Sequence, residues 1–191
     1  MGDPKKQRKK YKTPRFPWRT DTLQSELKLL GQYGLRNKKE LWRSETTLSK
    51  FRENARSLLG KSTEERAKPE TQLLNRLKRL GILSETAAID DVLDLSIEDF
   101  LERRLQTMVF NKGLARSIYQ ARQLISHGHV TVVNHRVKSP SYMVLRDEEA
   151  KIMYSPTSDF NDANHPMRQS LQVEKPKPTG AGPRSRSEGA R

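Results

Sequence analysis

The stretch ARQLISHGHVTV, residues 121–132, decides the fold because its periodicity changes in the middle. Its first half places apolar residues at helical spacing, and its second half alternates apolar and polar residues as a strand does. Gly128 lies between the halves, and glycine readily adopts the left-handed conformation in which many helices end. The sequence therefore predicts a helix that ends at Gly128 and leads directly into a small sheet.

Two stripes of different character run along this predicted helix, which begins upstream near Leu114. The apolar stripe should face a core and consists of Leu114, Ile118, Ala121, Leu124 and Ile125. The other stripe carries hydrogen-bond donors and no acidic residue: Lys112, Arg116, Gln120, Gln123 and His127. An ordinary solvated face is the alternative, although such a face normally also contains Asp and Glu. We expect the donor stripe to bind a polyanion lying along the helix.

The second half of the stretch is expected to open a small, strongly turned sheet. Residues 130–133 alternate, and Asn134-His135 is the predicted two-residue turn before a second strand at 136–138. Residues 142–145 and 150–154 can supply further short strands.

A helix is also expected ahead of the stretch. Ser96 should cap it, with Asp99 at the third position. One face should be apolar and contain Ile97, Leu101, Leu105 and Met108. Asp99 and Arg103 are one turn apart and should form an ion pair, while Arg104 and Thr107 should point outward. Together these elements predict a module of two helices followed by a sheet.

This pattern resembles the RNA-binding module named after small-subunit ribosomal protein four. The residues that carry the resemblance are Leu105, Lys112-Gly-Leu-Ala-Arg-Ser117, Ala121-Arg-Gln-Leu-Ile125, His127-Gly-His-Val130, Val133-Asn134, Val137 and Pro140-Ser-Tyr142. The turn Asn134-His135 departs from the usual Asn-Gly, and Arg146-Asp-Glu-Glu149 replaces the usual final Gly-Asp. Both departures affect the expected turns of the sheet and leave the helical face unchanged.

Composition points to the same class of partner. The chain has 191 residues, 37 Lys and Arg against 23 Asp and Glu, and a net charge of +14, so a polyphosphate would relieve its self-repulsion. A membrane surface would attract the same charge, but there is no long apolar run and no signal-peptide stretch at the N-terminus. Without cysteine, disulfides and thiolate metal sites are excluded. We expect a cytosolic or nuclear protein.

The first 20 residues are predicted to form a basic arm. It carries eight basic side chains against one acidic one, and Pro14 and Pro17 oppose a helix. Tyr11, Phe16 and Trp18 are interleaved with the cations, whereas a tail that served only solubility would not need three aromatic rings. Such arms order against phosphates and stack on exposed bases.

Residues 21–95 are expected to be helical. The first helix, 21–34, should turn Leu23, Leu27 and Leu30 inward. The next should run from residue 38 to 59 with Asn37 as its cap. Its apolar stripe is Leu41, Leu48, Phe51, Ala55 and Leu58.

Two further helices are predicted in this region. Ser62 with Glu65 should cap a short one, and Pro69 should lie in the first turn of another, which extends to residue 83. Acidic residues at positions 90–99 lie before and within a first helical turn, where the helix dipole stabilises them, so we interpret them as structural. Beyond residue 155 the periodicity fades, and residues 156–191 are predicted to be an extended or disordered basic tail.

The helical region extends the family resemblance. Residues 26–38, Trp42-Arg43 and Ala55-Arg56 resemble the eukaryotic form of the same family, known there as small-subunit ribosomal protein nine. With the module, the resemblance covers most of residues 11–155. It implies a structural constituent of the small ribosomal subunit. Such a protein binds a multi-helix junction in the 5′ domain of small-subunit rRNA, passes through the nucleolus during assembly, and lies close to neighbouring ribosomal proteins and to the channel that admits messenger RNA.

The expected fold class is α+β, with a helical N-terminal part framing the RNA-binding module and basic tails. The expected divisions are residues 1–20, 21–95, 96–155 and 156–191. Expected RNA contacts from the module are Arg103, Arg104, Lys112, Arg116, Ser117, Gln120, Arg122, Gln123, His127 and His129. Those from the arm are Arg8, Lys9, Lys10, Lys12 and Arg15, and those from the helical region are Arg36, Lys38, Lys39 and Arg43.

No catalytic constellation, metal site, cofactor loop or small-molecule site is predicted. His127, His129, His135 and His165 lack the cysteines or nearby carboxylates that a zinc site needs. Two alternatives remain. A nucleolar pre-rRNA processing factor could carry the same module, and so could an RNA-modifying enzyme such as a pseudouridine synthase. The enzyme would need a separate mixed α/β catalytic domain, and the rest of this chain is predicted to be helices and tails.

Overall fold

The computed structural model describes residues 9–162, 165, 166 and 168. The helices of its N-terminal half are α1 (Thr20–Gln32), α2 (Lys38–Leu59), α3 (Thr63–Arg79) and α4 (Asp91–Asp94). The second half contains α5 (Ile97–Glu102), α6 (Leu105–Asn111), α7 (Ile118–His127), β1 (Val130–Val132), β2 (His135–Arg136), α8 (Arg146–Glu149), β3 (Ile152–Tyr154) and the 3-10 turn Asp159–Asn161. The expected α+β fold class is confirmed.

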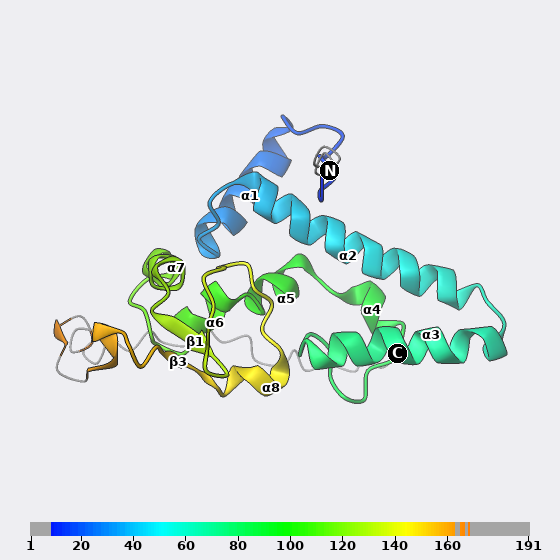
Figure 1. The fold of residues 1–191 in the computed structure, drawn as a ribbon. Coiled ribbons are helices and arrows are strands. Elements are labelled where there is room, and N and C mark those ends of the chain that lie inside the picture. Colours follow the sequence, from blue (N-terminus) through cyan, green and yellow to red (C-terminus); the bar gives the residue numbers. More distant parts are fainter. Residues whose placement is uncertain (1–8, 163–164, 167, 169–191) are drawn as a thin grey trace, which may run out of the picture.

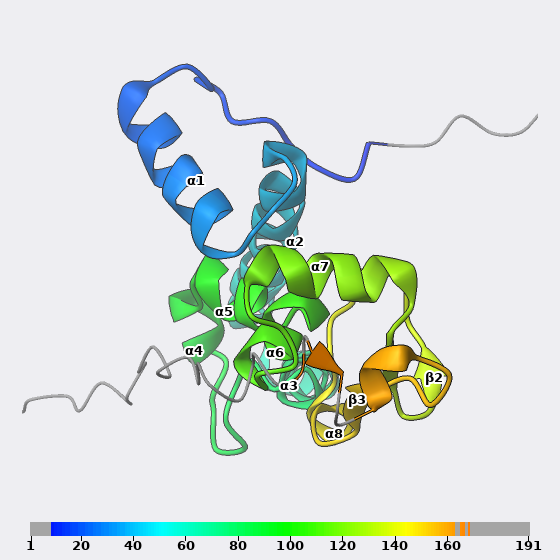
Figure 2. The ribbon, with the colours of Figure 1, turned by 90° about the vertical axis from the view of Figure 1, so that its left-hand side faces the viewer.

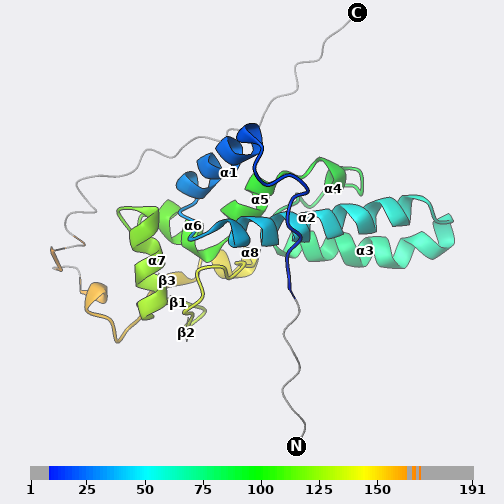
Figure 3. The ribbon, with the colours of Figure 1, turned by 90° about the horizontal axis from the view of Figure 1, so that it is seen from above.

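A long antiparallel pair, α2 and α3, extends to one side of the module, and α1 lies across the start of α2 (Figures 1 and 3). The Asn37 side chain accepts a hydrogen bond from the Glu40 backbone N–H at 3.1 Å, as expected for the cap. All five residues of the predicted α2 stripe are buried. Their core continues into the neighbouring helices, where the Phe51 and Phe100 rings stack 5.7 Å apart.

α3 is one continuous helix, so the expectation of two helices between residues 62 and 83 was wrong. Pro69 lies inside the helix, and the Ser62 side chain makes no capping hydrogen bond. Proline removes one backbone hydrogen bond from a helix interior. The helix continues because Leu73 and Leu77 are buried in the core shared with α2.

The inward face of α1 differs from the prediction because it buries a carboxylate. Leu27 is 59% exposed, whereas Glu26 is buried. The Trp42 Nε1–H donates to Glu26 Oε1 at 2.8 Å, and the Lys38 ammonium lies 2.8 Å from the other oxygen. These partners come from α2, so the spacing within α1 alone could not reveal them.

The predicted helix after Ser96 is two helices, α5 and α6. The capping box of Ser96 and Asp99 is confirmed. The Asp99 carboxylate accepts from the Ser96 backbone, so it forms no pair with Arg103. The helix is interrupted at Arg104, which forms an isolated β-bridge with Met143. Arg104 and Thr107, expected to point outward, are both buried.

The sheet is antiparallel in the order β2-β1-β3. Val132 pairs with His135, and the positive φ values are at Val133 (49°) and Asn134 (65°). The turn is therefore one residue earlier than expected, although Asn134 does belong to it. β3 confirms the strand predicted at 150–154, whereas the segment at 142–145 makes only the single bridge of Met143.

The sheet packs under α6 and α7, and α7 lies across the top of the module (Figure 2). Gly128 ends α7 in the left-handed conformation with φ of 81°, as expected. Residues 158–161, expected within an extended tail, instead form a 3-10 turn that packs Phe160 against His129 and Tyr154. The remainder of the predicted tail lies almost entirely outside the described residues.

Candidate nucleic-acid interface

The donor residues expected on one helix lie on two segments. α7 begins at Ile118, after Ser117, whose side chain accepts a hydrogen bond from the Gln120 backbone N–H at 3.2 Å. Lys112 and Arg116 therefore precede the helix, which corrects the prediction of a single stripe of five. The Arg116 N–H donates to Gln120 Oε1 at 2.7 Å and keeps the preceding loop against the first turn.

These residues nevertheless lie on one exposed face, and α7 itself carries no acidic residue. Arg116, Ser117, Gln123 and His127 are exposed, and Gln120 is half-buried. The opposite side of α7 is held by Ala121, Leu124 and Ile125 in the core between this helix and the sheet. Lys112 is exposed as well, and its ammonium donates to the Glu149 carbonyl oxygen.

Two expected RNA contacts, Arg104 and Arg122, instead share one carboxylate inside the protein. Arg104 Nη2 lies 2.8 Å from Glu40 Oε2, and Arg122 Nη2 lies 2.6 Å from Glu40 Oε1. Arg104 is only 4% exposed. A buried guanidinium needs such a partner because burial strips its hydration. The Glu40 ion pairs therefore join α2 to α6 and α7.

The electrostatics of this junction favour the charged carboxylate. Burial alone would raise the pKa of Glu40, but the hydrogen bonds and charges of Arg122 and Arg104 outweigh burial and hold that pKa below its ordinary value. Burial lowers the pKa of Arg104. Guanidinium pKa values start so high that Arg104 stays charged at neutral pH.

Gln106 completes the junction from the interior of α6. Its Nε2 donates to the carbonyl oxygens of Gly34 at 2.9 Å and Ile118 at 3.0 Å, and its Oε1 accepts from Arg122 at 3.2 Å. Gly34 has φ of +56°, and a Cβ there would lie 2.7 Å from a methyl carbon of Ile118. Glycine is therefore required where the chain between α1 and α2 approaches α7.

Arg103 and His129 are also engaged within the protein. Arg103 Nη1 lies 2.8 Å from Glu149 Oε2, and its Nη2 donates to the Val144 carbonyl oxygen at 3.2 Å. His129 Nδ1 lies 2.8 Å from the Ser158 hydroxyl oxygen. Both residues hold the loops of the module together, a role that spacing in the sequence did not indicate.

The N-terminal arm lies against α2 over its described residues. The Lys12 N–H donates to Thr46 Oγ1 at 2.9 Å, and the Tyr11 and Trp42 rings are 6.0 Å apart. Phe16 is 57% exposed and Trp18 is 84% exposed. The expected basic contacts Lys9, Lys10, Lys12 and Arg15 are exposed, whereas Arg8 lies outside the described residues.

The start of α2 adds basic residues near this arm. Arg36, Lys39 and Arg43 are exposed, while Lys38 is half-buried in its pair with Glu26.

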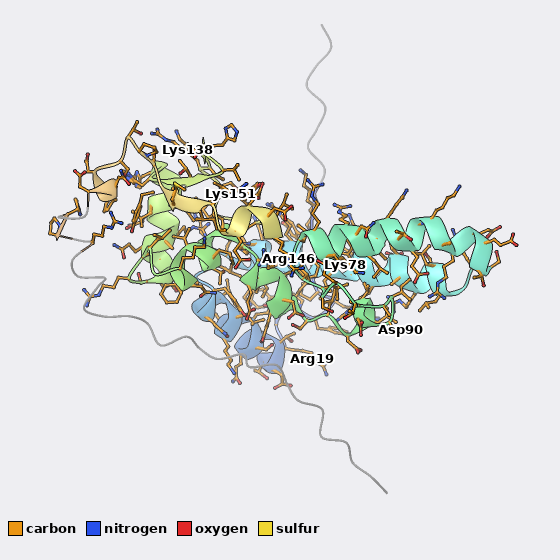
Figure 4. All side chains as sticks on the ribbon, turned by 90° about the horizontal axis from the view of Figure 1, so that it is seen from below. Arg19, Lys78, Asp90, Lys138, Arg146 and Lys151 are labelled. Atoms are coloured by element: carbon orange, nitrogen blue, oxygen red, sulfur yellow. The ribbon has the colours of Figure 1, made fainter. Side chains whose placement is uncertain are left out.

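Other basic residues were not predicted as RNA contacts because they come from distant segments of the chain. Figure 4 shows Lys138, Lys151, Arg146 and Lys78 in succession from the sheet side to α3. Arg146 pairs there with Glu85.

Arg76 and Arg79, which were not among the predicted contacts, line a cavity of about 610 Å³ together with Arg43. All three side chains are exposed. Helical spacing places both α3 arginines outside the α2–α3 core. It could not show that the loop after β2 folds back to form the facing wall.

Other kinds of site are not indicated by the described residues. Within the part of the chain that the structure describes, no three His, Asp or Glu side chains are grouped as metal ligands would be. Among the same residues, no helix combines the length and apolar character needed to cross a membrane.

Comparison with known proteins agrees with the expected family. A family model described as the S4 domain matches residues 103–149, from the break between α5 and α6 to the end of α8. The small ribosomal subunit protein uS4 of Hyperthermus butylicus is 53% identical over 174 residues, which cover 91% of this chain and 98% of that protein. The proteins of that name from Ignicoccus hospitalis (53% over 160 residues, 84% and 96%) and Sulfurisphaera tokodaii (52% over 170 residues, 88% and 95%) are similarly related.

Proposed function

This chain belongs to the uS4 family of small ribosomal subunit proteins, and we propose from this that it is a structural constituent of the small ribosomal subunit that binds and organises small-subunit rRNA. The observation that carries the proposal is the exposed face of α7, a helix without an acidic residue of its own, whose other side is fixed in the core of the module. A rigid row of donors suits the phosphate backbone of folded RNA, which is recognised largely by shape and charge.

We assign the RNA-facing role to the exposed candidates and to the half-buried Gln120. On the module they are Lys112, Arg116, Ser117, Gln120, Gln123 and His127, and on the arm and helices they are Lys9, Lys10, Lys12, Arg15, Arg36, Lys39 and Arg43. Arg103, Arg104 and Arg122 are positioning residues in this proposal, because their guanidinium groups are paired inside the protein. Residues 21–95 and 96–155 then act as two parts of one RNA-binding body.

The finer assignments rest on the family resemblance. They are early binding to a multi-helix junction in the 5′ domain of the rRNA, neighbouring ribosomal proteins as partners, a position near the channel that admits messenger RNA, and nucleolar passage during assembly. The role is structural and involves no catalysis. The Glu40 junction supports simultaneous binding of two RNA segments, because it fixes the angle between α2 and α7.

The experiment is a titration of small-subunit rRNA with the wild-type chain and with an Arg116→Ala, Gln120→Ala variant at several salt concentrations. About six phosphate contacts would give the wild type a log–log salt slope of about −4 to −5, and the variant should bind more weakly with a shallower slope. Because Gln120 also contacts the loop before α7, Gln123→Ala serves as a milder companion variant. An affinity that does not change with salt would contradict the mechanism.

Sedimentation distinguishes the proposal from the processing-factor alternative. A structural constituent should remain with mature small subunits and translating polysomes. A nucleolar processing factor should instead be found with precursor particles only.

A further inference from the structure

A groove separates the α2–α3 pair from the loop that follows β2. Its cavity of about 610 Å³ is lined from α2 by Arg43 and Thr47, from α3 by Arg76, and from the loop by Ser141 and Met143. The walls therefore come from segments almost 100 residues apart in the chain. A cavity of this size falls in the range of sites that enclose small organic groups.

The rim of the groove is strongly basic. Arg43, Arg76 and Arg79 are exposed there, and among the described residues no carboxylate pairs with any of the three. Of the described residues, Glu40 is the only acidic one that lines the groove, and Arg104 and Arg122 already neutralise it. The rim consequently attracts negative charge.

The floor has the opposite character. It is formed by Phe51, Phe100, Pro140, Met143 and Leu145. The Arg76 guanidinium carbon lies 5.5 Å from the centre of the Phe51 ring, which orients the planar group at the mouth of the groove. Planar guanidinium groups and aromatic rings are the surfaces on which single-stranded RNA bases stack.

We propose that this groove takes up one unpaired nucleotide of the small-subunit rRNA, with the base against the apolar floor and the flanking phosphates at Arg43, Arg76 and Arg79. This inference rests on the proposed function and names a specific contact within it. An acidic peptide would satisfy the rim but would leave the floor uncovered. A base with its two flanking phosphates matches both parts, because RNA carries a charge on each side of every base.

The test fills the groove without removing a charge. Ser141→Trp places an indole in the cavity, whereas Ser139→Trp adds the same group two residues away on the same exposed loop, at a position that does not line the groove. The Ser141 variant should bind small-subunit rRNA about tenfold more weakly, the loss expected for one stacked base, with an unchanged salt slope. The Ser139 variant should bind like the wild type.

A second variant guards against misfolding of the loop. Thr47→Trp fills the groove from α2 and should give the same loss, with thermal unfolding used to confirm that each variant is folded. Chemical probing of the rRNA at single-nucleotide resolution should show one base protected by the wild type and by Ser139→Trp, and reactive with Ser141→Trp and Thr47→Trp.

The outcomes separate this inference from the proposed function. If all folded variants bind rRNA as tightly as the wild type and no base changes reactivity, the groove holds no nucleotide, and the RNA-binding proposal is unaffected. If the wild type itself lacks tight, salt-dependent binding to small-subunit rRNA, the proposed function fails first. Loss of binding to a neighbouring protein alone would assign the groove to a peptide and overturn the inference.

Discussion

Two arginines six residues apart, one before α7 and one within it, look alike in the sequence but occupy different environments. Arg116 lies at the exposed face before the helix, whereas Arg122, one turn into it, points to the Glu40 junction and pairs with a residue 82 positions earlier. Arg104 is even more enclosed at that junction. Within the proposed function, basic side chains of the same type therefore divide into some that face outward and others that fix the shape of the surface.

The largest expected effect comes from removing the shared carboxylate. Glu40→Ala leaves Arg104 buried and removes the partner that Arg122 shares with it, and breaking a buried pair this way typically costs about 3–5 kcal/mol of stability. Urea unfolding followed by circular dichroism measures the loss. Glu53→Ala, an exposed site on the same helix, is the matched control and should change stability by less than about 0.5 kcal/mol. Equal effects at the two sites would mean that the junction contributes nothing.

Replacing one arginine of each kind with glutamine, Arg104 at the junction and Arg116 at the exposed face, tests the comparison directly. Arg104→Gln should destabilise the fold by about 2 kcal/mol, because Glu40 loses the buried one of its two partners. Its log–log salt slope for rRNA binding should be unchanged. Arg116→Gln should cost less stability than Arg104→Gln, because Arg116 is exposed, and should make the slope shallower by about 0.7–0.9, as for one lost phosphate contact.

The measurements are paired unfolding curves and rRNA titrations on both variants. A shallower salt slope for folded Arg104→Gln would place that side chain on the RNA after all. A loss of stability in Arg116→Gln as large as that in Arg104→Gln would show that this arginine belongs to the structural group.

The pH dependence of stability gives a third, smaller effect. The pKa of Glu40 is lowered in the folded protein, so its contribution is fully present above the unfolded value near 4.5 and is lost as pH falls through the lower folded value. Burial raises the pKa of Glu45 and of Glu102, whose contributions change in the opposite direction. We therefore compare wild type with Glu40→Gln between pH 6 and pH 3. The difference between them should shrink as the pH falls.

Features set by local contacts were predictable from sequence. The caps at Asn37 and Ser96, the end of α7 at Gly128 and the buried stripe of α2 follow from neighbouring residues, and all are confirmed. The family was also predictable, because the module's motifs have fixed spacings. The register of the turn after β1 was missed by one residue, since Val133 adopts a positive φ that valine rarely takes.

Features set by distant contacts were not predictable. Nothing near Arg104 shows that Glu40, 64 positions earlier, neutralises it. The groove has the same origin, because Arg76 and Met143 meet only when the loop after β2 folds against α3. The candidate site was therefore predicted as a set of residue types, and the structure divides that set into residues that face outward and residues that hold the surface in place.

The smallest effect compares the starts of α7 and α3. Ser117 caps α7 with its side chain, whereas Ser62 precedes α3 without a capping bond. Ser117→Ala should cost about 1 kcal/mol, and Ser62→Ala should be close to neutral. Urea unfolding of the two variants measures the difference. Ser117→Ala should also weaken rRNA binding slightly, because the cap orders the loop that carries Arg116 against the first turn. Equal stability of the two variants would show that packing of Ala121, Leu124 and Ile125 alone fixes the start of α7.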